Sequence, residues 1–307
     1  MTQAWARAAR GLALCVGLCL PWVASQAGMP RFCDRHTELS AEQQDKLLRF
    51  AAVIKGELER SGRSAAIVSR SGMDLSRFGQ RYSHSGIGLQ DNPNAPWSVR
   101  QLYYACEERQ PRVFDQGLAG FLMGTDNPGL GYVSVVFVPD AAGADLARHA
   151  LDRQRALQLL SPHYSANAYP FDLRYQNCNQ WVMELLASAW GAPDAPPAEA
   201  TRAHAQAWLQ QQGYQPSLMK VGNPALMVLG NFIPFVHHDD HPPEDVARWR
   251  YRVSMPASVE AFVRATVPGA TRMEFCQNGR QVVAHQGWEP LADGCQAGAQ
   301  DTVLALD

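Results

Sequence analysis

Apolar and polar residues alternate along residues 82–90, YSHSGIGLQ, and this alternation predicts a β-strand. One face of the strand would carry His84, Gly86 and Gly88, and the other face would carry Ser85, Ile87 and Leu89. Because two glycines leave the first face without side chains, we expect another part of the chain to lie close to the backbone beside His84.

Turn signals and apolar runs predict two further strands. Residues 91–96, DNPNAP, are typical of a turn, and residues 97–106, WSVRQLYYAC, are typical of a strand that returns beside the first. This hairpin would bring Gln101–Tyr103 level with His84. Residues 131–140, GYVSVVFVPD, are mostly apolar and predict a buried strand.

Two helices are predicted to support these strands. Ser40 and Gln43 occupy the positions of a capping box, so we expect a helix from Ser40 to about Arg60, ended by Gly62. Residues 144–160 predict a single second helix. Its inward-facing residues would be Leu146, Ala150, Leu157 and Leu160.

A third helix is predicted to begin with a cysteine. Apolar residues recur at positions 178, 181, 182, 185, 186 and 189, and a Pro/Ala-rich loop follows at 191–200. Asn177 is a good N-cap, so Cys178 would lie in the first turn, where the positive end of the helix stabilises a thiolate. The same position also suits a buried, unreactive cysteine. A histidine facing Cys178 would favour the reactive interpretation.

The first residues indicate that the protein is exported. Arg7 and Arg10 precede the apolar segment GLALCVGLCLPWVA, and small residues lead up to Ala27, as in a cleaved signal peptide. We therefore expect a single domain over residues 28–307, periplasmic or secreted, with no transmembrane span. The net charge of −2 does not favour binding to nucleic acid. We expect a monomer.

Export to an oxidising compartment favours disulfides in this chain. Beyond the signal peptide, five cysteines remain: Cys33, Cys106, Cys178, Cys276 and Cys295. Cys276 and Cys295 flank a short hairpin-like segment of the C-terminal extension and are natural partners, and Cys33 would then pair with Cys106. The connectivity cannot be deduced from the sequence, but this choice leaves Cys178 as the free thiol.

Residues 237–241, HHDDH, form a second group of potential ligands. His238, Asp240 and His241 fit part of a zinc-binding pattern, but Val236 stands where its first histidine is needed. A hydrogen-bonded turn, the wall of a substrate pocket and a metal site are the three interpretations, and we favour the turn. The apolar run at 221–236 is too short to span a bilayer, and it suits either an acyl or peptide groove or the core.

Several stretches together resemble a known family. They are FCDRH, AAIVSRSGMDLSRFGQRYSHSGIGL, WSVRQLYYAC, SANAYPFDLRYQNCNQWVMELLASAW, FVHHDDHP and RVSMPASVEAFV. They resemble the bacterial domain-of-unknown-function family 2145. The order of a histidine strand before a cysteine helix also resembles circularly permuted NlpC-type, papain-like cysteine hydrolases. The resemblance implies an α+β fold with a small antiparallel sheet packed against the cysteine helix, together with extra helices.

The resemblance to the hydrolases also implies a catalytic set. Cys178 would be the nucleophile and His84 the base and then the acid, while Gln101 would orient the imidazole. Glu107 and Glu108 are alternatives for this third position. The residues expected in the substrate pocket are Gln176, Asn177, His237 and Asp240.

These residues predict a cysteine-dependent hydrolase or acyl transferase without a cofactor. Its substrate would be an amide or ester bond of an envelope peptide or lipid. One alternative is a catalytically inactive envelope binding or assembly module. Another is a metal-dependent protein that uses His237–His241.

Overall fold

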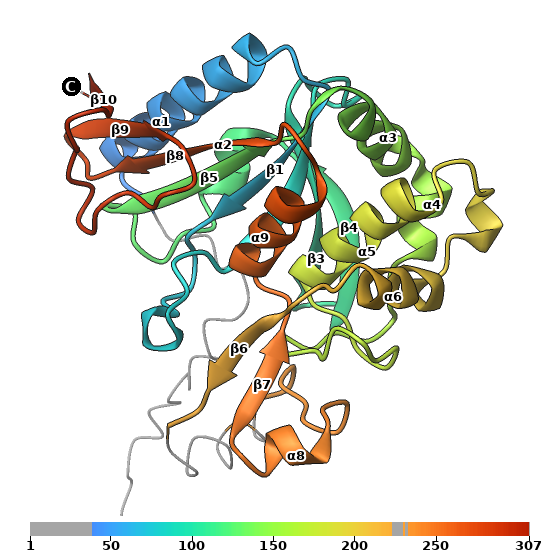
Figure 1. The fold of residues 1–307 in the computed structure, drawn as a ribbon. Coiled ribbons are helices and arrows are strands. Elements are labelled where there is room, and N and C mark those ends of the chain that lie inside the picture. Colours follow the sequence, from blue (N-terminus) through green and yellow to red (C-terminus); the bar gives the residue numbers. More distant parts are fainter. Residues whose placement is uncertain (1–38, 223–229, 231–232, 307) are drawn as a thin grey trace, which may run out of the picture. The chain divides into compact units, whose positions relative to one another are not determined.

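One antiparallel sheet of eight strands forms the centre of the molecule (Figure 1). The computed structural model describes residues 39–306 except 223–229, 231 and 232. The strands are β1 (Ala65–Arg70), β2 (His84–Leu89), β3 (Ser98–Ala105), β4 (Gln110–Gln116), β5 (Gly131–Phe137), β8 (Thr271–Gln277), β9 (Gln281–Gln286) and β10 (Thr302–Ala305). Their order across the sheet is β10-β9-β8-β5-β1-β2-β3-β4.

Helices cover both faces of this sheet (Figure 1). Helices α1 (Ala41–Arg60) and α2 (Leu118–Leu122) pack on one face, called here the α2 face. Helices α3 (Asp140–Leu151), α5 (Cys178–Gly191) and α9 (Pro256–Thr266) pack on the opposite face, called the α5 face, and α6 (Arg202–Gln211) packs against α5. The shorter elements are α4 (Arg153–Gln158), α8 (Pro243–Val246), η1 (Ser76–Phe78), η2 (Pro197–Glu199) and the paired strands β6 (Ser217–Lys220) and β7 (Arg250–Val253).

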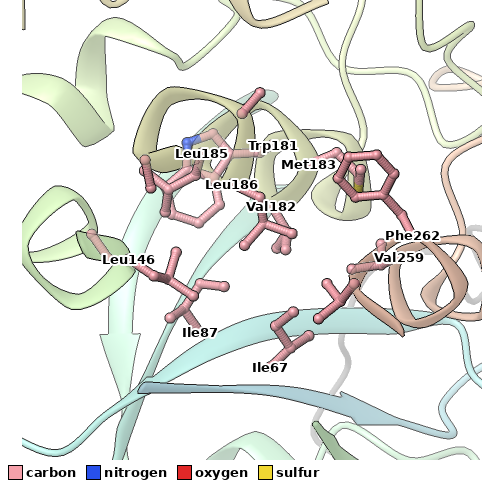
Figure 2. Packing of buried hydrophobic residues seen from close by; sticks show 14 of the residues in the cluster. Ile67, Ile87, Leu146, Trp181, Val182, Met183, Leu185, Leu186, Val259 and Phe262 are labelled. Atoms are coloured by element: carbon pink, nitrogen blue, oxygen red, sulfur yellow. The ribbon is translucent and has the colours of Figure 1, made fainter. Parts of the chain in front are cut away.

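The alternation of side chains along β1 and β5 separates the two largest apolar clusters of the described core, one on each face of the sheet. Ile67 of β1 and Ile87 of β2 point toward Trp181 and Val182 of α5, as Figure 2 shows. The neighbouring residue Val68 packs with α1 and α2 on the other face. Strands β1 and β5 contribute alternate residues to the two clusters, which is why both are buried along their whole lengths.

Most of the predicted elements are present. The capping box of Ser40 and Gln43 begins α1, and Gly62 follows its end with a φ of 65°. The predicted strands correspond to β2, β3 and β5, and α5 begins at Cys178 after Asn177. The described fold is α+β as expected, although the sheet is larger than the small one implied by the resemblance, because β8, β9 and β10 extend it beyond β5.

The single helix predicted over residues 144–160 is wrong. Asp152 has extended backbone angles and its side chain accepts a hydrogen bond from the N–H of Arg155, so it ends α3 and caps the separate helix α4. The change of axis places Leu157 on the surface with 45% of its area exposed, instead of in the core. Leu146 and Ala150 are buried as predicted.

The C-terminal extension carries the predicted disulfide between Cys276 of β8 and Cys295. Cys106 is also disulfide-bonded, and its predicted partner Cys33 lies outside the described residues, as does the predicted signal peptide. Among the described cysteines, only Cys178 is not disulfide-bonded, as predicted. In the part of the chain that the structure describes, no helix has the length and apolar composition needed to cross a membrane.

Candidate functional site

The first turn of α5 holds Cys178 at the boundary between the core and a pocket. The Asn177 side chain accepts a hydrogen bond from the N–H of Gln180 at 2.7 Å and donates to the carbonyls of Ala166 and Ser254, both at 3.3 Å. These three bonds fix the helix start between two other segments. Cys178 is 8% exposed and packs with the cluster on the α5 face.

A buried carboxylate fixes the segment that leads into this helix. This carboxylate belongs to Glu184, which lies in α5 beyond the first turn. It accepts hydrogen bonds from Gln176 at 2.5 Å, Gln206 at 2.8 Å and Arg202 at 2.8 Å. Arg202 also donates to the carbonyls of Leu173 and Tyr175, at 2.7 and 2.8 Å. The chain before Cys178 is thus held by a satisfied polar network, which confers a defined geometry on the helix start.

A pocket of about 240 Å³ opens at this end of α5. Cys178, Asn177 and Asn179 lie in its wall, with Ser83, the residue that precedes β2. Much of the remaining wall is apolar, including Met73, Leu75, Phe78, Met219, Val221 and Met255. Val221 and Val236, which belong to the apolar run at 221–236, also lie in the pocket wall. Phe235 of the same run is buried. The described part of the run therefore contributes both to the pocket and to the buried interior.

The HHDDH segment contributes a different residue to the pocket from those predicted. His238 lies in the pocket wall and stacks on Tyr251, with ring centroids 5.2 Å apart. His237 instead stacks on Tyr175, with centroids 4.3 Å apart. Asp240 accepts a hydrogen bond from the N–H of Tyr169 at 2.7 Å. Neither His237 nor Asp240 lines the pocket, and Gln176 belongs to the network around Glu184.

Asp240 and His241 are buried in a turn, whereas Asp239 is exposed. Burial raises the pKa of Asp240 to about 6, although the hydrogen bond from Tyr169 opposes the shift. Burial lowers the pKa of His241, whose Nε2–H donates to the carbonyl of Asn167 at 2.6 Å. Over the residues described, no group of three or more His, Cys, Asp or Glu side chains could hold a metal ion. The segment fits the hydrogen-bonded turn that the sequence favoured.

His84 and Gln101 form the predicted pair. The Nε2 of His84 donates to the Oε1 of Gln101 at 2.5 Å, and the amide of Gln101 donates to Gln116 at 2.7 Å. The register of the hairpin, with Ile87 opposite Arg100, explains how the two side chains meet on one face. Glu108, the alternative to Gln101, bonds Arg112 at the surface.

The face on which this pair lies differs from the expectation. The His84 ring contacts Phe121 of α2, with centroids 5.6 Å apart, and Gly86 and Gly88 share this face. A side chain at Gly86 would overlap Val99 of β3, at 2.4 Å. The glycines therefore admit side chains from the neighbouring strand and not the start of α5.

Cys178 approaches the same strand from the other side. The side chain of Asn179 donates to the carbonyl of Ser83 at 3.3 Å, so the starts of α5 and β2 are adjacent, as predicted. Cys178 packs with Ile87 on the α5 face, whereas His84 points to the α2 face. The backbone arrangement agrees with the expected site, and the direction of the histidine side chain does not.

Three residues of the described pocket wall were not expected there: Ser83, Tyr164 and His238. The alternation along β2 could have identified Ser83, because it shares the parity of Ser85 and Ile87. No local signal places His238 or Tyr164 at Cys178, since both reach the pocket through long-range packing of the chain.

Comparison with known proteins gives one match. The sequence profile of a bacterial family, described as "Uncharacterized protein conserved in bacteria (DUF2145)", matches residues 57–263. This range is more than half of the 307-residue chain and includes every residue of the pocket. No curated protein and no solved structure matches the chain.

Proposed function

The chain belongs to the DUF2145 family, and from its pocket we propose that it is an exported thiol-dependent hydrolase or acyl transferase. One observation carries the proposal: Cys178, which is not disulfide-bonded, lies in the first turn of a helix and in the wall of a pocket. The helix N-terminus favours the thiolate, which is the nucleophilic form. The disulfide Cys276–Cys295 supports an oxidising compartment, and the order of β2 before α5 supports the resemblance to permuted NlpC-type hydrolases.

The proposed reaction is acyl transfer through a thioester. A histidine accepts the proton of Cys178, and the sulfur forms a bond to the carbonyl carbon of an ester or amide. N–H groups of the first turn of α5 stabilise the oxyanion, since a helix leaves these groups without intrahelical acceptors. The C–O or C–N bond then breaks, and the leaving group takes the proton from the histidine. Water or a second acceptor releases the acyl group and returns a proton to the thiol.

The proposed base is His238. It lies in the wall of the pocket that contains Cys178, whereas the ring of His84 lies on the α2 face. The resemblance implies His84 as the base. To accept the proton of Cys178, His84 would have to turn its side chain from the α2 face to the α5 face. In the proposed site, His84 and Gln101 have a positioning role, because their hydrogen bond holds the start of β2. The carbonyl of Ser83, just before β2, accepts a hydrogen bond from Asn179.

The rate of alkylation by iodoacetamide at different pH values tests this proposal. We expect Cys178 of the wild type to be alkylated well below about pH 8, where an unperturbed thiol is mostly protonated. His238→Ala should move the profile to higher pH, and His84→Ala should leave it in place. Incubation with p-nitrophenyl octanoate should add the acyl mass to Cys178, and Cys178→Ala should prevent this.

Each other outcome changes the proposal in a defined way. A shift in His84→Ala but not in His238→Ala would assign the base to His84. A wild-type profile like that of a free thiol, without acylation, would overturn the hydrolase. The second candidate, an inactive binding module, would then stand, because the orientation of His84 away from the thiol favours it.

A further inference from the structure

We propose that the pocket beside Cys178 binds an aliphatic acyl chain. This inference rests on the proposed function and specifies its substrate class: esters or amides of a medium-length fatty acyl group. The lining of the pocket, its distribution of charge and its volume carry the inference independently of the identity of the base.

The lining is apolar and adaptable. Met73 comes from the segment before η1, Met219 from β6 and Met255 from the start of α9, so three methionines enter from separate parts of the chain. An unbranched thioether side chain adjusts to an irregular or flexible ligand. Val221 and Leu75 are further apolar residues of the wall. Such a wall suits methylene groups better than the amides of a peptide.

The described lining also has polar residues, in addition to those near the start of α5: Tyr164, Asn167, His238 and Tyr251. Asn177, Asn179 and Ser83 lie around Cys178. Asp74 and Arg77 carry the formal charges of the described lining, and both residues are exposed. Asp74 accepts a hydrogen bond from the N–H of Ser76, and Arg77 lies over the ring of Phe78. A ligand would thus place its carbonyl group at Cys178 and its chain against the methionines.

The volume sets the length of the chain. A protein cavity of about 150 Å³ lined by Leu, Ile and Phe accommodates benzene, which has six carbons. The volume here is about 240 Å³. By proportion, the pocket accommodates an acyl chain of roughly six to ten carbons.

A series of N-alkyl maleimides, from ethyl to dodecyl, tests the inference in the intact protein. The maleimide group reacts with Cys178 in every case, so only the chain length varies. We expect the alkylation rate to rise by up to about fourfold for each added methylene group, which is the factor expected if that group is fully buried. The rate should level off near ten carbons. Met219→Trp, which fills the pocket, should flatten the series. Leu218→Trp is the matched control, because Leu218 is exposed on the same strand.

The outcomes separate this inference from the proposed function. A flat series in the wild type overturns the acyl pocket, even if the ethyl compound reacts rapidly and the thiol is activated. A steep series with slow reaction of the ethyl compound supports the pocket and overturns the activated nucleophile. If Met219→Trp fails to fold, calorimetric titration of Cys178→Ala with octanoic acid decides: binding supports the pocket, and its absence overturns it.

Discussion

Asp240 is a carboxyl group held where ionisation is unfavourable. Its pKa in the folded protein is about 6, because burial outweighs the hydrogen bond from Tyr169. The unfolded chain has the ordinary value near 4. Between these two values the folded state holds a proton that the unfolded state has released. The free energy of unfolding therefore falls as the pH rises through this window.

We predict that Asp240→Asn removes this loss of stability. The amide is neutral at every pH and keeps an oxygen for the N–H of Tyr169. Relative to the wild type, the variant should gain at most about 3 kcal/mol between pH 4 and pH 7. Urea unfolding at a series of pH values measures the difference.

Asp239→Asn is the control for this measurement. Burial acts to raise the pKa of Asp239, but the hydrogen bond and charge of Arg174, together with hydrogen bonds from its own backbone and from Tyr175, lower it by more. Its contribution to stability therefore runs in the opposite direction, being lost as the pH falls. A constant difference between Asp240→Asn and wild type across the pH range would contradict the assigned shift.

His84 and Gln101 show what a sequence can determine about individual residues. The turn at 91–96 fixes the register of the hairpin, and the register brings these two side chains together. The alternation of residues shows that His84 shares a face with Gly86. It does not show which helix covers that face, because α2 and α5 come from distant parts of the chain. For this reason the sequence alone could not identify which histidine lies with Cys178 in the pocket.

At the scale of elements, the buried pair of Glu184 and Arg202 joins α5 to α6. Both side chains are nearly inaccessible, and Arg202 also holds the carbonyls before Cys178. Arg202→Met should lower the free energy of unfolding by about 3–5 kcal/mol, because it leaves the Glu184 carboxylate buried without its cation. Urea unfolding at neutral pH provides the measurement.

Arg174→Met is the matched comparison, because Arg174 pairs with Asp239 at the surface. The same substitution there should cost less than about 1 kcal/mol. Equal losses in the two variants would show that the buried pair contributes no more than an exposed one.

The helices also differ in how far local sequence determines them. The start of α1 follows from its capping box and that of α5 from Asn177, since both signals act within one turn. The break between α3 and α4 depends on Asp152, which is compatible with a continuous helix and becomes a cap only where α4 turns away. Helical periodicity over residues 144–160 cannot show that change of axis.

At the scale of the whole molecule, the disulfide Cys276–Cys295 ties the segment after β9 to β8 across a separation of 19 residues. Replacing both cysteines by alanine should lower the free energy of unfolding by about 3 kcal/mol, the loop-closure value for a loop of this length. Guanidinium unfolding without reductant measures it. Cys276→Ala alone should show nearly the same loss. An unchanged midpoint in the double variant would contradict a stabilising role for the bridge.

The number of strands in the sheet lay beyond prediction from local pattern. Strand β5 pairs with β8, so a strand from the middle of the chain meets one near its end. Alternation and apolar runs identify strands separately, but they carry no information about which strands are neighbours across such a separation. The α+β class could be predicted, whereas the extension of the sheet by β8, β9 and β10 could not.

The pairing of β5 with β8 has a consequence for the order of folding. Strands β1 to β5 are complete by Phe137, but β5 has a neighbour on only one side until Thr271–Gln277 has been synthesised. Until then the backbone groups along its other side form an open edge that can pair with another chain. Closing this long loop is also entropically slow. A nascent or truncated chain that ends before Thr271 is therefore the species most prone to aggregate, and β8 is the segment that protects it.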